Sequence, residues 1–409
     1  MLGMLSSMGY SILHLGQVMV PSITSPFSSL AILRSRGWYL HFGQARISIS
    51  DCFIPITWIT EADLKNLLRA DELLIRCRRD DGDMVKVGVI GVGSMGQNHA
   101  RIHAETGHLV GVHDLDQTQS SKVAERFGVR SYESVESLLA AVDAVDICTI
   151  TTKHYEIARR AIATGKHLLV EKPFTGDSSK AAELCALAEK KGVVLAAGFV
   201  ERYNPIVGVA REAVKQNRFG EVISFASRRV SSFPARIRDV GVIMDLGIHD
   251  VDVLRYITGQ EIRSVFALGG KVANQRFEDH ANMLIEMQSG LVAFIEINWL
   301  TPMKVRKVSL TCSEGFVQLD YMDQSLEISS SIIKDFDSAN AFHVPLEFDV
   351  RKIAVRKEEP LKLELQDFIR AIESSSVPMA SGWDALADLK VCEAALESLR
   401  TGKKVEIGQ

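Results

Sequence analysis

The residues best suited to chemistry begin with three glycines that directly follow an apolar strand pattern. Val87 to Ile90 leads into Gly91-x-Gly93-x-x-Gly96, and a helical pattern starts at once. In a dinucleotide site the first glycine permits a tight turn, the second lets the backbone approach the pyrophosphate, and the third lets helix and strand pack closely. The unpaired N–H groups at the helix start would face the diphosphate. The pattern predicts a cofactor loop made of Gly91, Val92, Gly93, Ser94, Met95 and Gly96, the alternative being a strand–turn–helix without nucleotide.

An acidic residue stands where such a site needs one. A second strand pattern, Leu109 to His113, ends in Asp114, 18 residues after Gly96. A carboxylate there accepts hydrogen bonds from a free ribose 2′-hydroxyl and repels a 2′-phosphate. At ~5 Å and an effective dielectric constant of ~20, each like-charge pair costs about 3 kcal/mol, on the order of a hundredfold in affinity. We therefore expect NAD in preference to NADP; in the alternative, Asp114 only caps the turn.

The triplet Glu171-Lys172-Pro173 ends a buried strand pattern that starts at Lys166. Ligands of open α/β sheets bind at the carboxyl ends of the strands, so this position favours a functional Glu171 and Lys172. Pro173 has no N–H and forces the chain to turn, and it biases Lys172 away from helix. A desolvated lysine at this edge can exchange a proton with a substrate hydroxyl. The alternative is a surface lysine that merely follows a strand.

Asp245 and His249 stand four residues apart in a helical pattern and therefore share one helix face. A carboxylate and an imidazole on one face at a domain junction suit substrate orientation and proton relay. A capping aspartate and a satisfied buried histidine are the structural alternative. Residues 94–106 form another helical pattern, in which His99 and His103 also share a face. No third ligand accompanies that pair, so we expect its helix side to face the cofactor or solvent rather than a metal.

Composition excludes several classes of function. The chain has 409 residues, of which 46% are hydrophobic and 24% charged, as in ordinary globular proteins with two domains. A net charge of −4 and the lack of a basic aromatic platform argue against nucleic-acid or membrane partners. The cysteines are scattered without a Cys-x-x-Cys pair, so neither a disulfide framework nor a zinc site is indicated and a reducing cytoplasm fits best. They are Cys52, Cys77, Cys148, Cys185, Cys312 and Cys392.

Residues 1–83 are patterned differently from the rest. No Asp or Glu occurs up to Ser50, a bias that resembles a transit segment, yet no charged region, apolar core and cleavage site follow in order. Their apolar runs are too short to span a bilayer. A helix is expected over 61–78. Met84 directly precedes the first strand of the cofactor motif, so we interpret 1–83 as a disordered or dispensable extension, or as the result of a mis-assigned start.

The remaining chain predicts two domains, 84–203 and 204–409. From 84 to about 200, strand and helix patterns alternate, which is typical of a Rossmann-type doubly wound parallel sheet. In the second domain the strand patterns come as hairpins, which predicts an antiparallel sheet with one covered face, and its other face is a candidate for self-association. Two amphipathic helices, 360–375 and 383–401, finish the chain. The strands of the second sheet are expected at 221–230, 262–273, 281–288, 291–299, 304–312 and 315–321.

With these residues in view, 84–409 resembles the Gfo/Idh/MocA family of NAD(P)-dependent sugar and polyol oxidoreductases. The glycine turn, the Glu-Lys-Pro triplet and the Asp245…His249 helix occur in the family's order and spacing. The resemblance implies that Lys172 is the catalytic lysine, that His249 transfers the proton and that Asp245 binds a substrate hydroxyl. It also implies cofactor contacts from Thr149, Glu171 and Lys172, and from Thr151 and His154 beside the nicotinamide ribose. The second domain would be α/β, with a large, mostly antiparallel sheet that builds dimers or tetramers. Ile150 departs from the family pattern, where proline is common.

Within the family, residues 198–205 and 239–250 resemble members that oxidise the C3 hydroxyl of UDP-N-acetylhexosamines on the way to 3-amino sugars. Arginines at 228, 229, 236 and 238 could clamp a diphosphate or simply form a solvated face. The alternatives are an inositol or simple-sugar dehydrogenase and, in another class, a non-catalytic NAD-binding sensor. The expected substrate contacts are Lys172, Arg202, Tyr203, Asn204, Arg236, Arg238, Asp245 and His249, and Lys172 and His249 are expected to remove the hydroxyl proton together.

Overall fold

The computed structural model describes residues 84–234, 239–333 and 346–408, together with four short strands nearer the N-terminus. The chain divides into two compact units, Met1–Gly82 and Asp83–Gln409. In the first unit β1 (Ser11–Leu15) pairs antiparallel with β2 (Val18–Ser22), and β3 (Tyr39–Phe42) with β4 (Ala45–Ser48). The helix expected over 61–78 lies outside the described residues. No helix in the described part of the chain is both long and apolar enough to span a membrane.

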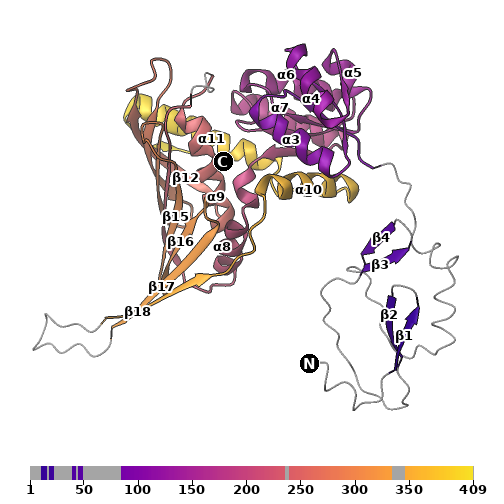
Figure 1. Cartoon of the computed structure of the whole chain (residues 1–409). Helices are drawn as coiled ribbons and strands as arrows, with labels where there is room; N and C mark the ends of the chain where they lie inside the picture. Colours follow the sequence, from indigo (N-terminus) through magenta and orange to yellow (C-terminus); the bar gives the residue numbers. More distant parts are fainter. Residues whose placement is uncertain are drawn as a thin grey trace, which may run out of the picture. The chain divides into compact units, whose positions relative to one another are not determined.

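The second unit begins with a six-stranded parallel sheet (Figure 1). Its spatial order is β10-β9-β8-β5-β6-β7, and the direction of winding reverses beside β5. Ligands of such sheets bind at the carboxyl ends of the strands, where the order reverses. The strands are β5 (Val87–Ile90), β6 (Leu109–His113), β7 (Arg130–Ser131), β8 (Ala144–Ile147), β9 (His167–Glu171) and β10 (Leu195–Gly198). The connecting helices are α3 (Ser94–Glu105), α4 (Gln117–Phe127), α5 (Val135–Leu139), α6 (Thr151–Ala163) and α7 (Ser178–Lys191).

The second sheet has nine strands in the order β18-β17-β16-β15-β11-β14-β13-β12-β19. All neighbours are antiparallel except β11 and β14, which are parallel, so the sheet is mixed rather than purely antiparallel. Side chains alternate between a covered and an open face, as in β14, where Ala293 and Ile295 are buried between exposed neighbours. The strands are β11 (Val222–Val230), β12 (Ile262–Gly270), β13 (His280–Met287), β14 (Val292–Asn298), β15 (Val305–Cys312), β16 (Gly315–Asp320), β17 (Ser325–Ile333), β18 (Leu346–Ile353) and β19 (Val405–Glu406).

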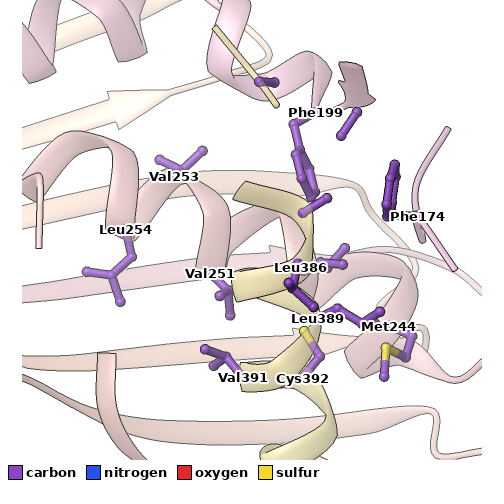
Figure 2. Close-up of a cluster of buried hydrophobic side chains, with 14 of the residues drawn as sticks. Phe174, Phe199, Met244, Val251, Val253, Leu254, Leu386, Leu389, Val391 and Cys392 are labelled. Carbon is purple, nitrogen blue, oxygen red and sulfur yellow. The ribbon is translucent and has the colours of Figure 1, made fainter. Parts of the chain in front are cut away.

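Helices join the two sheets into one core. Val251, Val253 and Leu254 of α9 belong to the same buried cluster as Leu386 and Leu389 of α11 (Figure 2). Because α11 also contacts α7 and β10, and α10 contacts α3, the end of the chain packs back on the first domain. The helical segments after β10 are η2 (Val200–Tyr203), α8 (Pro205–Lys215), η3 (Ile243–Gly247), α9 (Ile248–Thr258), α10 (Pro360–Glu373) and α11 (Gly382–Thr401).

Two features of this domain depart from the sequence-based prediction. Strands β17, β18 and β19 were not expected. Ser325–Ile333 lacks a clear polar–apolar alternation, and β19 has two residues. The helix that carries Asp245 and His249 is not uniformly α-helical. It begins with the π-helical turn η3, and α-helical geometry starts at Ile248. Such turns often occur at functional sites.

Candidate functional site

The glycine turn after β5 has the geometry that a dinucleotide site needs. Gly91 has φ +88°, in the left-handed region, and an added Cβ there would lie 2.8 Å from the backbone of Cys148. A Cβ on Gly96 would lie 1.8 Å from the carbonyl oxygen of Gly91, so only glycine lets α3 pack this close to the turn. By contrast, a Cβ on Gly93 would meet no atom within 4 Å. The backbone at Gly93 is therefore open to a ligand, as the sequence predicts.

The N-terminal end of α3 faces this opening. Gly93 is the N-cap residue, and it has no side chain that could cap the helix. The first hydrogen bond of the helix runs from Gln97 N–H to the carbonyl oxygen of Gly93, at 3.0 Å. The amides of Ser94, Met95 and Gly96 belong to the first turn and have no carbonyl one turn earlier within the helix. Amides in this position carry the positive end of the helix dipole and suit a diphosphate.

Asp114 ties the end of β6 to the glycine turn. Its Oδ2 accepts from Val92 N–H at 2.8 Å, and its Oδ1 accepts from Asp116 N–H at 3.0 Å. The side chain is partly exposed, and each carboxylate oxygen keeps a further lone pair for a ligand. The capping alternative and the ribose-binding prediction are therefore compatible, since the same carboxylate serves the turn and remains partly exposed.

The loop after β8 borders the same opening. Thr149 is partly exposed, Ile150 is exposed, and Thr151 N–H donates to Asp239 of the second domain at 3.0 Å. His154 is buried, with Nε2 3.0 Å from the carbonyl oxygen of Thr149 and Nδ1 2.9 Å from that of Pro173. Burial lowers the pKa of His154. It thus holds the β8 loop beside the turn that carries Lys172.

Lys172 reaches from the parallel sheet to the second domain. The Lys172–Pro173 peptide is cis, and the chain leaves the sheet there. The ammonium donates to the Asp245 carboxylate Oδ1 at 2.6 Å and to the Asp245 carbonyl oxygen at 2.9 Å. An ammonium has three N–H donors, so one remains for a substrate oxygen. Lys172 is thus a half-buried cation with a fixed position and a free donor.

The turn that supplies Asp245 is held by a buried carboxylate. Glu278 Oε1 accepts from Ile243 N–H at 3.1 Å, and its carbonyl accepts from Val242 N–H at 3.0 Å. A Cβ on Gly241 would lie 2.1 Å from that carboxylate, so glycine makes room for it. Burial raises the pKa of Glu278. The sequence carries no signal for this role of Glu278, because nothing local connects it with a helix 35 residues away.

His249 lies one turn after Asp245, beside the same lysine. The residue is 8% exposed, and its Nδ1 has no hydrogen-bond partner within the described residues. Burial lowers the pKa of His249 well below its usual value, and the neighbouring cations Lys172, Arg229 and Arg306 lower it further. The imidazole is therefore neutral near pH 7 and able to accept a proton.

An arginine that the sequence analysis missed adds positive charge here. Arg306 on β15 has a partly exposed side chain and donates to Glu201 at 2.9 Å. Its charge acts on both His249 and Asp245. Glu201 also accepts from Arg229 at 2.8 Å. These residues come from separate strands and helices, so no sequence spacing could have grouped them.

Arg229 has a structural role, because its guanidinium is buried in ion pairs. Its side chain is 2% exposed and donates to Asp250 at 2.8 Å as well as to Glu201. Arg228 points to the other side of β11 and pairs with Glu296 at 3.0 Å. The predicted diphosphate ligands Arg236 and Arg238 lie outside the described residues. Of the four arginines, the two described ones therefore have protein partners.

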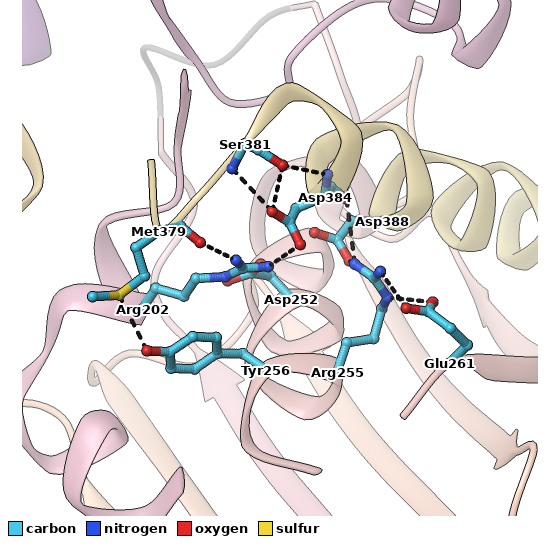
Figure 3. Close-up of polar contacts among 9 residues, drawn as sticks. All are labelled: Arg202, Asp252, Arg255, Tyr256, Glu261, Met379, Ser381, Asp384 and Asp388. Carbon is cyan, nitrogen blue, oxygen red and sulfur yellow. Dashed lines mark hydrogen bonds and ion pairs between the residues drawn. The ribbon is translucent and has the colours of Figure 1, made fainter. Parts of the chain in front are cut away.

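Arg202, Tyr203 and Asn204, which were also expected to contact substrate, have protein partners too. Figure 3 shows Arg202 between Asp252 and Asp384, with its guanidinium 2.6 and 3.1 Å from their carboxylates. Tyr203 donates to Asp367 at 2.9 Å, and Asn204 caps α8. Since all three are buried, we assign them to packing between η2 and the helices around it rather than to the substrate.

His99 and His103 are buried, not on a helix side that faces the cofactor or solvent as expected. His99 Nδ1 and His103 Nε2 each lie 2.8 Å from Asp146 Oδ2. Within the described part of the chain, no group of three or more His, Cys, Asp or Glu side chains is arranged to hold a metal ion. The pair instead belongs to a buried polar cluster beneath the glycine turn.

Comparisons with known proteins agree with this geometry. The family model "Oxidoreductase family, NAD-binding Rossmann fold" matches residues 85–199, and "GFO/IDH/MocA C-terminal domain" matches 207–318. UDP-N-acetylglucosamine 3-dehydrogenase of Acidithiobacillus ferrooxidans is 32% identical over 315 residues, which cover 76% of this chain and 96% of that protein. A solved structure of that enzyme, 29% identical, covers 77% of this chain and 99% of its own with a TM-score of 0.69.

Other relatives have different substrates. scyllo-Inositol 2-dehydrogenase of Bacillus subtilis is 28% identical over 342 residues, which cover 79% of this chain and 96% of that protein. GenD2 from gentamicin A biosynthesis, solved in complex with NAD, has a TM-score of 0.68 at 27% identity and covers 80% of this chain and 98% of its own. The open glycine turn, the helix N-terminus and the available carboxylate of Asp114 are the features that fit NAD in this chain.

Proposed function

Since the chain belongs to the Gfo/Idh/MocA family of NAD-binding oxidoreductases that act on CH–OH groups, we propose that it oxidises the C3 hydroxyl of a UDP-N-acetylhexosamine. The observation that carries the proposal is the similarity to UDP-N-acetylglucosamine 3-dehydrogenase, which spans 96% of that protein. The 3-keto product would feed amination to a 3-amino sugar, as in lipid A or surface polysaccharide synthesis.

The site residues suit this oxidation. Bound NAD supplies the acceptor for hydride. Lys172, fixed by Asp245, donates its remaining N–H to the hydroxyl oxygen and stabilises the negative charge that develops there. Neutral His249 accepts the hydroxyl proton. Asp245 orients the lysine and offers a second carboxylate oxygen to a neighbouring hydroxyl.

A positive group at the site favours a charged substrate over a neutral one. Arg306 is held by one bond to Glu201, so its guanidinium has further donors for an anion such as a diphosphate. Inositol offers no anion to this arginine. Arg306→Gln should therefore raise the KM for UDP-N-acetylglucosamine by about tenfold, a typical effect of losing one charged hydrogen bond, and leave any activity on inositol unchanged.

The decisive experiment is a thermal-shift panel with NAD, NADP, UDP, UDP-N-acetylglucosamine, inositol and glucose, followed by absorbance at 340 nm with NAD and each sugar. NADH formation with UDP-N-acetylglucosamine, and protection by UDP alone, are expected. NADH formation with inositol and no response to UDP would instead establish the inositol 2-dehydrogenase activity of several relatives. A protein that binds NAD but oxidises no member of the panel would contradict both.

The open face of the nine-stranded sheet supports self-association. Leu284, Val292 and Phe294 lie on this face and are 43–50% exposed, and Leu284 is directly opposite Phe294 across β13 and β14. Two copies that pair these faces would bury the apolar row. We therefore propose a homodimer or homotetramer. Light scattering should show a mass above that of one chain, and Phe294→Asp should reduce it; an unaltered mass in the variant would place the interface elsewhere.

The described cysteines suit a reducing compartment. Cys148, Cys185, Cys312 and Cys392 are free thiols. Burial raises the pKa of Cys148 and of Cys312 to about 11, so neither is a reactive thiolate. We propose a cytoplasmic enzyme with reduced cysteines. Mass spectrometry of protein that is denatured and alkylated at the moment of cell lysis, without added reductant, should find all four thiols modified.

A further inference from the structure

A chain of four buried ionisable side chains runs beneath the strand end that carries Lys172. His103 Nε2 lies 2.8 Å from Asp146 Oδ2, and the same oxygen lies 2.8 Å from His99 Nδ1. His99 Nε2 lies 3.0 Å from Glu171 Oε1. None of the four residues is more than 7% exposed. His99, His103 and Asp146 are at most 1% exposed, so any role they have must be exerted through the groups that they contact.

The contacts of His99 fix its charge. Each ring nitrogen faces a carboxylate oxygen, from Asp146 on one side and from Glu171 on the other. An ionised carboxylate only accepts hydrogen bonds, so both ring nitrogens must donate, and that is the imidazolium form. Burial lowers the pKa of His99, but its hydrogen bonds with the carboxylates of Asp146 and Glu171 raise it, and the pKa lies well above its usual value. His103 and His99 in turn outweigh burial and lower the pKa of Asp146.

Glu171 connects this cation with Lys172. One carboxylate oxygen is held by His99, and the other accepts from the backbone N–H of Lys172 at 3.1 Å. A Cβ on Gly198 would lie 2.9 Å from the Glu171 carboxyl carbon, so glycine in β10 leaves the space that this side chain fills. Glu171 is thus fixed at both oxygens, and it fixes the backbone from which the lysine extends to Asp245.

The buried carboxyl group of Glu364 shows why a positive charge on His99 is needed. Glu364 of α10 is buried, and neither of its carboxyl oxygens has a partner within the described residues. Burial, followed by the charges of Glu171 and Asp146, raises the pKa of Glu364 well above its usual value, and His99 opposes that rise. Without His99, three acidic groups would remain in one buried region, and Glu171 would be left without its counter-ion.

We propose that His99 is a positioning residue for Lys172, acting through the Glu171 carboxylate that it holds with one ring nitrogen. The proposal rests on the proposed role of Lys172 in catalysis, and the protonation and position of the residues can be tested without it. A misplacement of about 1 Å in a catalytic group can lower turnover by ~10²-fold. His99 thereby contributes to the rate although it touches neither cofactor nor substrate.

The first test uses the unmodified protein. With ¹⁵N-labelled histidine, the resonances that disappear in His99→Gln identify His99. Both of its ring nitrogens should carry a proton at pH 8, where an ordinary histidine is neutral. A neutral His99 at that pH would overturn the proposal, whatever the enzyme's substrate proves to be.

The second test follows the position of Lys172 directly. An amine-reactive reagent and peptide mass spectrometry should label Lys172 about tenfold faster in His99→Gln than in the natural protein, because its contact with Asp245 loosens. Turnover should fall by ~10²-fold with KM within about threefold, as expected for a misplaced catalytic group. Unchanged labelling of Lys172 would contradict the proposal. If the natural protein oxidised no sugar, the proposed function would fail, while labelling and protonation would still decide the role of His99.

Two further variants separate positioning from general damage. His167→Gln alters a half-buried histidine at the opposite end of the same strand, where Nδ1 accepts from Val194 N–H at 2.9 Å. Glutamine can also accept there, so labelling and turnover should be unchanged. In the double variant His99→Gln/Glu171→Gln, the uncompensated carboxylate at residue 171 is gone, so the second substitution should lower turnover far less than Glu171→Gln does alone. Independent, multiplicative effects would show that His99 does not act through Glu171.

Discussion

Lys172 and Asp245 meet at 2.6 Å, although they lie 73 residues apart and belong to different domains. Lys172 comes from the carboxyl end of β9 in the parallel sheet, and Asp245 from the π-helical turn η3 of the second domain. His249 follows one turn later, and burial and the positive charge of Lys172 lower its pKa. The candidate site therefore exists only where the two domains pack together.

Removal of the lysine amine should abolish most of the activity and spare cofactor binding. Lys172→Ala loses the donor to the hydroxyl oxygen, and losses of this kind typically lower turnover by ~10²–10⁴-fold. The glycine turn and Asp114 are untouched, so NAD binding measured by fluorescence should persist. Lys180→Ala, which removes an exposed lysine paired with Asp177 on α7, is the control and should retain full turnover. Full activity in Lys172→Ala would remove the lysine from the mechanism.

The acid limb of the pH–rate profile should report His249. Burial and the cations Lys172, Arg229 and Arg306 lower its pKa well below 6.5, so the imidazole stays neutral and active as the pH falls through that value. Activity should decline only at a lower pH, where His249 gains a proton. Arg306→Gln removes one of these cations and should move the limb toward higher pH. A limb at or above 6.5 in the natural enzyme, or one unmoved by Arg306→Gln, would contradict this assignment.

The lowered pKa of His249 also makes the stability of the folded protein depend on pH. His249 takes up a proton more readily in the unfolded chain than in the folded one, because its pKa is lowered only on folding. The free energy of unfolding should therefore fall as the pH drops below about 6.5, the unfolded value. His249→Asn removes this contribution, and thermal melts at successive pH values should show a flatter profile for the variant.

The choice between NAD and NADP should depend on Asp114. Asp114→Ser removes the carboxylate that repels a 2′-phosphate, and the ratio of kcat/KM for NADP to that for NAD should rise by about a hundredfold. The same substitution removes the acceptor of Val92 N–H, so a modest loss of NAD affinity is expected as well. Asp116→Ser, whose side chain caps α4 and does not bond the turn, serves as the control. An unchanged ratio would mean that Asp114 only holds the loop.

The sequence was informative wherever a local pattern dictates the backbone. The glycine spacing predicted both the turn at Gly91 and the close packing at Gly96, because these demands are local and steric. The buried strands and the Pro173 turn were predicted for the same reason. That Lys172 and His249 belong to one site was predicted from the family resemblance and not from any local pattern.

The sequence could not predict which charged side chains pair with partners far away along the chain. The sequence suggested Arg202 as a substrate contact and Arg229 as part of a diphosphate clamp, yet both are buried against carboxylates from other elements. Arg306 and Glu278 carry no local signal, since their partners lie on other strands and helices. His99 and His103 share a helix face as predicted, but only the fold shows that Asp146 on β8 lies against that face.

Residues 84–409 should fold and bind NAD without the preceding unit. The chain separates into Met1–Gly82 and Asp83–Gln409, and the first strand of the parallel sheet starts at Val87. A protein that starts at Met84 should show the same NAD-dependent rise in melting temperature and the same kcat/KM as the full chain. An insoluble or inactive product would show that residues 1–83 are needed.

Arg202 should matter for stability rather than for substrate binding. Its guanidinium is 4% exposed and lies between Asp252 and Asp384, next to Asp388 (Figure 3). Arg202→Met leaves buried carboxylates unpaired, which typically destabilises a protein by about 3–5 kcal/mol. Burial already raises the pKa of Asp252, and loss of the arginine raises it further. The folded variant then holds a proton on Asp252 that the unfolded chain releases. The loss in free energy of unfolding relative to the natural protein should therefore grow as the pH rises above about 4.

A second arginine provides the control for this prediction. Arg202 and Arg211 both lie over the Tyr256 ring, with guanidinium carbons 4.9 and 4.1 Å from its centre. Arg211 is exposed, so Arg211→Met loses only a cation–π contact worth about 0.5–1 kcal/mol. Urea unfolding should therefore separate the two variants by several kcal/mol, while KM for the sugar stays unchanged in both. A stable Arg202→Met protein with a raised KM would restore Arg202 to the substrate site.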